Sequence, residues 1–505
     1  MPTTGGEHAG QHRPNVLFLL SDQHNPHIVG FAGNRIIRTQ NLDRLAAESA
    51  QFDAAYCQFP LCTPSRISMW TGLLPHRCSA WSNNYPILPG LTTIPGHFGD
   101  HGYATCGVGK MHEGGERPMN GFQVRPYGDL RPNPYSCHQP DPLHTIKNHI
   151  WTNHKIGHFP FAGPSEIPNS LLQDNVVTRE SLAFILDHQQ QHPDQPWFLC
   201  ASYQRPHHPL TAPACYFRHY WPDGPALSPL PTGYPDSIHP HDRFIVDDYH
   251  LAEFSREDLR RGLAAYYASV DFMDDCAGDL LSGLEREGLL DNTIIIYTSD
   301  HGDLESEHGL WWKRSYYDGS ARVPVLLRVP GGNPQRVSAP VELLDLFPTL
   351  CELCDLPVPE GLDGESLLPL IRADASSPHR KDFARSEHIA RMETTFRMIR
   401  TSQWKYVEFP EYPPVLFDMK HDPDEEHNLA ASPECAAVVA ELHQRLWEDG
   451  QSWESLNQQR EADRERLEGE RHVCEDCSPN QYCLANGEIV NADAMLYERI
   501  LKETP

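Results

Sequence analysis

Residues 62–72, Cys-Thr-Pro-Ser-Arg-Ile-Ser-Met-Trp-Thr-Gly, place a thiol, a guanidinium and the start of a helix in one short segment. Pro64 suits a first helical turn and Gly72 suits the position just after the last one, so the segment predicts a helix. Cys62 then lies at the positive end of the helix dipole, where backbone N–H groups favour an anion, with Arg66 one turn away. This pattern indicates a nucleophile beside an anion site. The alternative is a buried cysteine before an ordinary helix.

The same segment resembles the signature of the type I sulfatases, which is Cys-x-Pro-Ser-Arg followed by a short helix that ends in Thr-Gly. Five matched positions at fixed spacing favour this interpretation over the ordinary helix. In that family a dedicated enzyme oxidises the cysteine to formylglycine (3-oxoalanine), whose hydrated aldehyde supplies the nucleophile. The resemblance therefore implies that Cys62 is a precursor and that a formylglycine-generating or anaerobic maturation enzyme is a partner.

Four apolar segments each lead directly into a cluster of polar residues. Continuous apolar runs, separated by helical stretches at 42–49 and 259–287, are typical of a sheet that helices cover on both faces. Open α/β sheets bind ligands beyond the carboxyl ends of their strands, so the polar clusters are expected at one edge. The expected strands are 15–20, 103–108, 197–202 and 293–298, and the clusters are 21–24, 109–112, 205–209 and 299–303.

The side chains expected at this edge suit a metal ion and an oxyanion. Carboxylate, imidazole and amide groups offer mostly oxygen ligands, which a hard divalent cation prefers. Taken singly, a strand-end aspartate is more often a helix cap and a lysine more often solvated. The convergence of four clusters with the Cys62 segment favours a functional site. The candidates for the metal are Asp22, Gln23, Asp300 and His301, and those for the oxyanion are Arg66, Lys110 and Lys313.

The resemblance to the sulfatases extends from about residue 14 to residue 430. It includes Gly109-Lys-Met-His112, Ser299-Asp-His-Gly302 and Trp404-Lys-Tyr406. It implies the α/β fold of the alkaline phosphatase superfamily, in which helices flank a large, mostly parallel central sheet and a smaller α+β subdomain follows. The implied metal ligands are Asp22, Gln23, the matured Cys62, Asp300 and His301, and the implied catalytic residues are Cys62, Arg66, Lys110, His112, His207 and Lys313.

The implied reaction is the hydrolysis of a sulfate monoester by a covalent route. The metal activates the formylglycine hydrate, and positively charged side chains stabilise the transition state. By the same resemblance, His207 with Lys313 protonates the departing alcohol, and His112 takes a proton from the second hydroxyl so that sulfate leaves. The implied substrate is a small-molecule or saccharide sulfate ester.

Two positions depart from the usual sulfatase pattern. Most members carry a second aspartate where this chain has Gln23, and many carry asparagine where it has His301. The Asp-Gln and Asp-His combination resembles the branch that contains choline sulfatases and phosphonate monoester hydrolases. A phosphonate monoester hydrolase or phosphodiesterase that uses the same site is therefore the alternative, and a catalytically silent binding protein is a third. Calcium is the expected metal, and the lost carboxylate leaves manganese or magnesium as alternatives.

Composition agrees with a large enzyme, because 505 residues with 39% hydrophobic content can bury sizeable cores. The net charge of −28 opposes nucleic acid as a partner. Residues 1–15 contain no apolar signal-peptide region and no run reaches the length of a membrane span, so we expect a cytoplasmic protein without a membrane partner. Fourteen scattered cysteines favour reduced thiols. Zinc at Cys351 and Cys354, or at Cys474 and Cys477 with Cys483 or His472, is disfavoured.

The pattern divides the chain into three parts. A catalytic α/β domain is expected over 14–375, with a helix over 341–356, and a polar linker over 372–380. The C-terminal α+β subdomain, 381–470, begins with antiparallel strands at 396–400 and 404–409 and continues with a helical stretch over 433–468. The tail, 471–505, is expected to be an oligomerisation arm, a lid over a neighbouring site or a loose tail, and the first of these allows a homo-oligomer. Loops at 125–158 and 221–248 are expected to set specificity.

Overall fold

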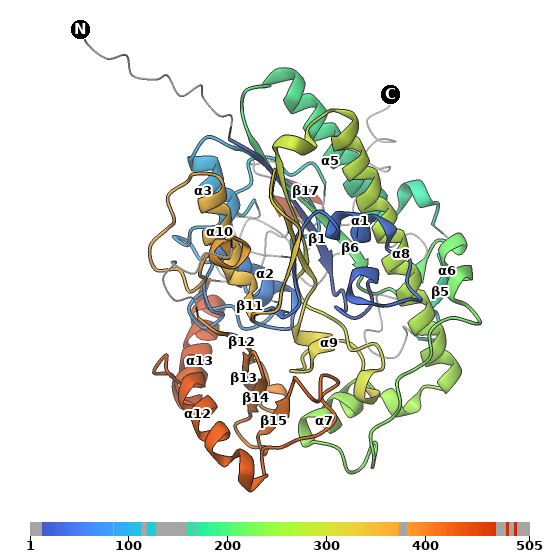
Figure 1. The fold of residues 1–505 in the computed structure, drawn as a ribbon, viewed down its shortest axis with the longest axis vertical. Coiled ribbons are helices and arrows are strands. Elements are labelled where there is room, and N and C mark those ends of the chain that lie inside the picture. Colours follow the sequence, from blue (N-terminus) through green and yellow to red (C-terminus); the bar gives the residue numbers. More distant parts are fainter. Residues whose placement is uncertain are drawn as a thin grey trace.

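The computed structural model describes residues 13–83, 85–112, 119–127, 159–165, 167–372, 381–470, 481–483 and 489–491. A seven-stranded sheet forms its centre (Figure 1). All neighbouring strands run parallel except that one, Val325–Arg328, is antiparallel to both neighbours, which confirms the mostly parallel sheet. The spatial order is β10 (Gln335–Val337), β2 (Ala50–Phe52), β9 (Val325–Arg328), β8 (Thr293–Ser299), β1 (Asn15–Asp22), β6 (Trp197–Pro206) and β4 (Ala104–Gly109).

Helices cover both faces of this sheet, because side chains of the central strand β1 alternate between two cores. Val16, Phe18 and Leu20 pack in one core, and Leu17 and Leu19 in the other. Figure 1 shows the two helical layers on opposite sides of the strands. The first core includes residues of α2 (Cys62–Thr71), α3 (Ile94–Asp100) and α10 (Leu346–Leu353), and the second includes residues of α1 (Gln40–Ala46), α5 (Gln173–Gln191) and α8 (Arg256–Arg286).

Helix α2 confirms the helix expected from the sequence. It begins at Cys62 and ends at Thr71, and Gly72 follows with φ 68° and donates its N–H to the Ser68 carbonyl. Glycine adopts this left-handed conformation without the steric cost of a Cβ. Every residue of α2 is buried, so the helix is held on all sides rather than on one face.

A second, antiparallel sheet follows the central one along the chain and lies at the lower end of the view in Figure 1. Helix α12 (Ala436–Leu446) packs on this sheet through Leu442 and Leu446. Helix α13 (Trp453–Glu470) packs against the catalytic part, where Leu456 contacts Trp81 and its neighbours. The expected antiparallel strands are confirmed. The strands in order are β12 (Phe383–His388), β13 (Phe396–Thr401), β14 (Trp404–Glu408) and β15 (Val415–Asp418).

Two expected helices differ in the structure. The helix expected over 341–356 begins only at Leu346, because Val341 pairs with Ala55 in a parallel ladder and the Asp345 carboxylate accepts the Glu342 N–H at 2.8 Å. The helical stretch expected over 433–468 is two helices, α12 and α13. Gly450, with φ 73°, lies in the turn between them, and the Ser452 hydroxyl caps the start of α13 by accepting the Ser455 N–H. The short elements are β3 (Ala55–Tyr56), β5 (Gly163–Pro164), β7 (Thr211–Ala212), β11 (Val341–Glu342), α6 (Ala214–Tyr220), α7 (Pro240–Asp248), α9 (Asp318–Ala321) and α11 (Leu368–Arg372).

Several expectations fall wholly or partly outside the described residues. These are most of the linker at 372–380, most of the loop at 125–158, and the second Cys-x-x-Cys pair. Of the tail, two short strands are described, β16 (Gln481–Cys483) and β17 (Ile489–Asn491), which pair antiparallel. The domain limits 14–375, 381–470 and 471–505 stay predictions.

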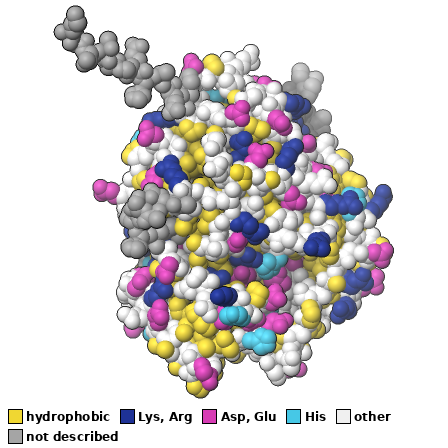
Figure 2. Space-filling model, viewed as in Figure 1, with side chains coloured by type: hydrophobic (Ala, Val, Ile, Leu, Met, Phe, Trp, Pro, Cys, Tyr) yellow, Lys and Arg dark blue, Asp and Glu magenta, His cyan; other side chains and the backbone are white. Residues whose placement is uncertain are grey.

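Ten cysteines of the described residues are free, and eight of these ten are buried. In the same part of the chain, no helix has the length and apolar character needed to span a membrane. Acidic and basic side chains are interspersed over the face shown in Figure 2. This mixture agrees with a charged surface that carries no broad basic stripe on that face.

Candidate active site

The polar clusters meet at the carboxyl ends of four adjacent strands. Asp22 ends β1, and Lys110, His207 and Asp300 directly follow β4, β6 and β8. Two backbone hydrogen bonds join these ends, from His207 to the Asp22 carbonyl at 3.1 Å and from Asp300 to the Ser21 carbonyl at 3.4 Å. The edge predicted from the sequence therefore exists in the structure, and the start of α2 lies against it.

A glycine makes one of these approaches possible. Gly109 has φ 93°, and a Cβ at this position would lie 2.0 Å from the Ser202 carbonyl oxygen. Only glycine fits such close contact between β4 and β6 with this backbone conformation. The Lys110 N–H then bonds to that same carbonyl at 3.1 Å, which directs the lysine towards the site.

The sulfur of Cys62 is the point on which the site converges. Lys313 Nζ lies 3.0 Å from Sγ and His301 Nε2 lies 3.3 Å from it. Lys110 Nζ and an Asp22 carboxylate oxygen both lie at 3.9 Å. All five side chains are buried.

The ligand atoms of Asp22, Cys62, Asp300 and His301 all lie within 4.8 Å of one another. Two carboxylates and an imidazole beside position 62 form a donor set suited to a divalent cation. The residues thus fit the metal that the sequence predicted. Among the residues that the structure describes, no other group of three or more histidine, cysteine, aspartate or glutamate side chains gathers in this way, which leaves Cys351 and Cys354 without further ligands of these types.

Arg66 holds the two carboxylates of this cluster in place. Its Nε donates to Asp300 at 2.8 Å and its Nη2 to Asp22 at 3.1 Å, while Nη1 donates to the Lys110 carbonyl and, at 3.1 Å, to Ser202 Oγ. The guanidinium is fully buried. Because every nitrogen of the guanidinium binds a protein acceptor, the structure gives Arg66 a positioning role. The contact with the sulfate that the sequence predicted for Arg66 stays a prediction.

Gln23 takes part in the site through its side-chain amide. Its Oε1 accepts a hydrogen bond from Lys313 Nζ at 2.7 Å, and its Nε2 donates to the Asp303 carboxylate. Its backbone has φ 66°, and its N–H donates to Asp300 at 3.1 Å. Gln23 therefore links Lys313 to the metal cluster. Its expected place as a metal ligand stays a prediction.

Two histidines border the cluster. His207 Nε2 lies 4.0 Å from the Asp22 carboxylate and faces the site, and its Nδ1 lies 2.8 Å from the His208 carbonyl and 3.1 Å from the Gln204 side-chain amide. Burial, with Lys110 and Lys313, holds the pKa of His207 well below its usual range. His112 is buried at φ 59°, and its carbonyl accepts a hydrogen bond from Thr63 at the start of α2.

The positive groups dominate the electrostatics around Cys62. Burial and Asp22 raise the pKa of the Cys62 thiol, but Lys110, Lys313 and His301 outweigh them and lower it to about 7. Burial likewise opposes the charge of Asp22, yet Lys110 and Arg66 hold the pKa of this carboxyl well below its usual range. The site therefore stabilises negative charge at position 62, as an oxyanion site requires.

Three supporting residues were not assigned a role from the sequence. Asp303 accepts from the Gln23 amide and from the Trp312 N–H at 2.7 Å, and Tyr266 of α8 donates to the Gln23 carbonyl at 2.6 Å. Ser202 donates to the Lys110 carbonyl. Asp303 and Ser202 lie beside predicted strand ends, so their positions in the sequence could have marked them as site residues. Tyr266 lies in the middle of a long helix, and nothing in its local sequence marks it.

The chain matches the Sulfatase family over residues 14–356 and the C-terminal family of N-sulphoglucosamine sulphohydrolase over residues 306–452. It is 32% identical to a choline-sulfatase of Rhizobium meliloti (strain 1021), over 83% of each chain. It is 30% identical to arylsulfatase K of Gallus gallus, over 83% of this chain and 79% of that one. The chain therefore belongs to the sulfatase family and is an enzyme of that family.

Solved structures agree in fold. A phosphonate monoester hydrolase of Agrobacterium radiobacter superposes with a TM-score of 0.73 at 24% identity, and covers 95% of this chain and 99% of that one. The phosphonate monoester hydrolase of Silicibacter pomeroyi gives 0.74 at 23% identity, over 95% and 99%. At this level of identity the likeness concerns the fold, and it confirms the α/β architecture predicted from the sequence.

Proposed function

We propose that this sulfatase cleaves a sulfate monoester with the matured Cys62 as its nucleophile. The observation that carries the proposal is the convergence on one atom, Cys62 Sγ, of two ammonium groups, an imidazole and a carboxylate. An oxygen at this position would lie beside both the metal ligands and the groups that bind an oxyanion. The sulfatase signature in α2 and the family match support the maturation to formylglycine.

The proposed cofactor is one divalent cation, with calcium favoured over manganese and magnesium. Asp22, Asp300, His301 and the matured residue 62 would hold it, with Gln23 as a further ligand. When bound, such a cation lowers the pKa of a hydroxyl and polarises a sulfate oxygen. The preference for calcium follows from the oxygen-rich donor set, and the neutral Gln23 amide in place of a carboxylate keeps the smaller cations as alternatives.

The chain's own residues then divide the remaining work. The ammonium groups of Lys110 and Lys313 lie beside Cys62 Sγ. They bring positive charge to the transferred sulfuryl group, where negative charge develops in the transition state. Arg66 keeps the two aspartates aligned. His207 presents Nε2 to the site, and we assign to His207, together with Lys313, the protonation of the leaving alcohol. His112 is assigned the proton of the second hydroxyl when sulfate departs.

A phosphonate monoester hydrolase or phosphodiesterase is the second candidate, and the Gln23 amide favours it. A sulfate monoester and a phosphate diester both present a singly charged tetrahedral centre, so the same groups serve either reaction. Two of the structures of similar fold are phosphonate monoester hydrolases. The relative turnover of an aryl sulfate and an aryl phosphonate separates the two candidates.

The proposed substrates are small-molecule or saccharide sulfate esters. The choline-sulfatase relative and a structural neighbour solved with D-glucosamine-2-N,6-O-disulfate support both classes. The trial set is therefore choline sulfate, sulfated monosaccharides and an aryl sulfate. We keep the maturation enzyme as a required partner in this proposal.

The decisive experiment compares Cys62→Ala with wild type after co-expression with a formylglycine-generating enzyme. Mass spectrometry of the peptide that contains residue 62 should show an aldehyde in wild type, and Cys62→Ala should have no turnover of an aryl sulfate. Cys78→Ala is the matched control, because Cys78 is equally buried but lies outside the site, and it should keep its activity. Full activity in Cys62→Ala would overturn the proposal.

A further inference from the structure

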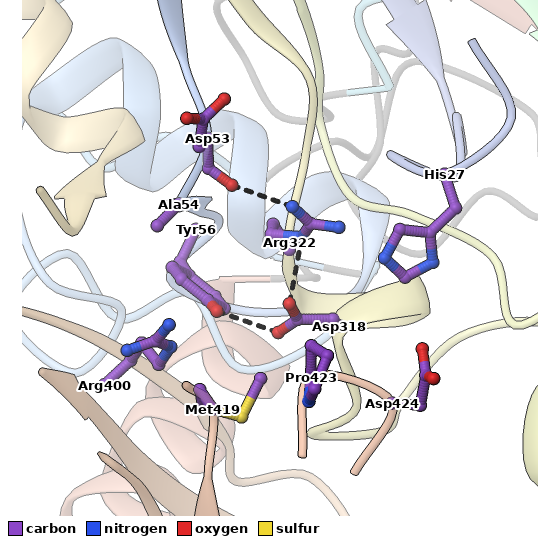
Figure 3. A pocket seen from close by; sticks show the side chains of 10 residues that line it. All are labelled: His27, Asp53, Ala54, Tyr56, Asp318, Arg322, Arg400, Met419, Pro423 and Asp424. Carbon is purple, nitrogen blue, oxygen red and sulfur yellow. Dashed lines mark hydrogen bonds and ion pairs between the residues drawn. The ribbon is translucent and has the colours of Figure 1, made fainter. Parts of the chain in front are cut away.

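The segment between β8 and α9 carries Lys313 into the active site. Figure 3 shows where this segment ends, at the first residue of α9, Asp318, which accepts a hydrogen bond from Tyr56 at 2.8 Å. Nearer to β8 the segment folds back on itself, since the Leu304 N–H donates to the Trp312 carbonyl at 2.8 Å. Lys313 therefore extends from a loop that is fastened on both sides.

One carboxylate, that of Asp303, closes this loop and also reaches Gln23. Its Oδ1 accepts the backbone N–H groups of Trp312 at 2.7 Å and of Glu305 at 3.3 Å, and its Oδ2 accepts the side-chain amide of Gln23. The Asp303 side chain is fully buried. Because Trp312 directly precedes Lys313, the first of these contacts fixes the backbone from which the lysine extends.

The Gln23 amide has a definite orientation between Asp303 and Lys313. A carboxylate oxygen accepts hydrogen bonds and donates none, so Asp303 selects the NH₂ side of the amide. The carbonyl oxygen Oε1 is thereby turned towards Lys313 Nζ, which donates to it at 2.7 Å. With the amide reversed, its NH₂ group would face the ammonium, donor against donor.

We propose that Asp303 is a positioning residue that holds the Lys313 ammonium beside Cys62 Sγ, through the Trp312 backbone on one side and the Gln23 amide on the other. Nζ lies 3.0 Å from Sγ. Because the lysine stem is long and flexible, these two contacts hold the side chain at both of its ends. The proposal rests on the proposed function, since the charge that Lys313 brings to the sulfuryl group and to the leaving alcohol acts from this place.

Asp303→Asn tests the proposal, because it changes a donor–acceptor relation and almost no volume. The new amide keeps its oxygen on the two backbone N–H groups, so its NH₂ faces Gln23 and reverses the Gln23 amide. In crystals of the unmatured, full-length variant we expect Lys313 Nζ more than about 4 Å from Cys62 Sγ, beyond the distance of an ion pair. After maturation, turnover of an aryl sulfate should fall about tenfold to a hundredfold, the usual cost of losing a residue that orients the groups of a metal site.

A second substitution should reverse this effect. When Asp303→Asn is combined with Gln23→Glu, the carboxylate at position 23 accepts from the new amide and from Lys313 Nζ, and the net charge equals that of wild type. We expect Lys313 to return to Cys62 Sγ and most of the lost turnover to be recovered. Gln23→Glu alone should lower turnover, because its carboxylate faces that of Asp303. A purely structural defect at residue 303 would not be repaired at residue 23.

Asp274→Asn is the matched control. Asp274 is also buried, and it accepts a backbone N–H from Leu42 at 2.8 Å and a side-chain amide from Asn41 at 2.9 Å, but it lies on α8 outside the site. This variant should keep Lys313 in place and wild-type turnover. If Asp303→Asn does not fold, Gln23→Met tests the same link, because it removes the acceptor of Lys313 and should displace the ammonium in the same way.

Two results would overturn the role of Asp303. One is Lys313 Nζ in its wild-type place beside Sγ in crystals of Asp303→Asn or Gln23→Met, and the other is a double variant that is no more active than Asp303→Asn. A wild-type protein without turnover of sulfate esters would instead count against the proposed function. The crystal comparison would still decide whether Asp303 positions Lys313, because it needs neither maturation nor substrate.

Discussion

Replacing Arg66 by methionine tests whether this residue positions the metal ligands. The substitution removes a fully buried guanidinium that bonds Asp300 at 2.8 Å and Asp22 at 3.1 Å. Breaking a buried ion pair costs about 3–5 kcal/mol, because the remaining charge loses its partner in a dry environment. Asp22 keeps Lys110, and Asp300 keeps the N–H groups of Gln23 and His301. We therefore expect a loss of about 3–5 kcal/mol in the free energy of unfolding, together with loss of turnover.

Urea denaturation, followed by tryptophan fluorescence in the presence of a chelator, measures this loss without a contribution from bound metal. Arg77→Met is the matched control, because its pair with Asp363 lies at the surface and its removal should cost less than about 1 kcal/mol. Arg66→Lys should recover little of the lost stability or turnover. It keeps the charge, but one ammonium cannot reach the separate acceptors that three guanidinium nitrogens bind.

The reasoning fails if Arg66→Met unfolds at the same urea concentration as wild type and yet has no activity. That outcome would mean that Arg66 acts on the sulfate, as the sequence predicted. Parallel losses of stability and bound calcium would support the positioning role.

Three other measurements probe the site and the C-terminal part. Asp22→Asn should lose most of its bound metal, measured by elemental analysis, and most of its activity, and full activity of metal-free wild type would contradict the metal assignment. His207→Ala should slow sugar sulfates at least about tenfold more than aryl sulfates, because a phenolate leaves without a proton, and equal losses would argue against acid catalysis. Burial raises the pKa of Glu387, but His76 and Arg397 outweigh it and lower the value from 4.5 to about 2. Stability from Glu387 is therefore complete above pH 4.5 and lost as the pH falls towards 2, by about 3 kcal/mol, so Glu387→Gln should flatten acid-denaturation curves in that window, and an unchanged curve would refute the linkage.

The sequence predicted the sheet edge well, because apolar runs that end in polar clusters report strand position and direction directly. Asp22, Lys110 and Asp300 follow from that pattern alone. The partners of Arg66 do not, since a hydrogen bond to a specific oxygen depends on how α2 packs against the ends of four strands. Tyr266 was missed for the same reason, because its contact with Gln23 joins residues 243 positions apart.

Element boundaries failed where tertiary pairing overrides periodicity. The apolar run that starts at Val341 reads as a helix, but two of its residues pair with β3 before the helix begins. The helical stretch after 433 reads as continuous, because its charged residues suit a helix on both sides of Gly450. In both cases the sequence pattern predicted a helix correctly but did not predict the residues at which the helix begins or ends.

The distance along the chain between the parts of the site has a consequence for the timing of biosynthesis. Lys313 follows Cys62 by 251 residues, and it cannot contact the sulfur before it has itself been synthesised. At about 5–20 residues per second, roughly 13–50 seconds of translation separate the two residues. During this interval Cys62 cannot have its native neighbours, whereas in the finished protein it has no exposed surface. We expect a modifying enzyme to have access to Cys62 in that interval, and faster synthesis to leave more of the chain unconverted.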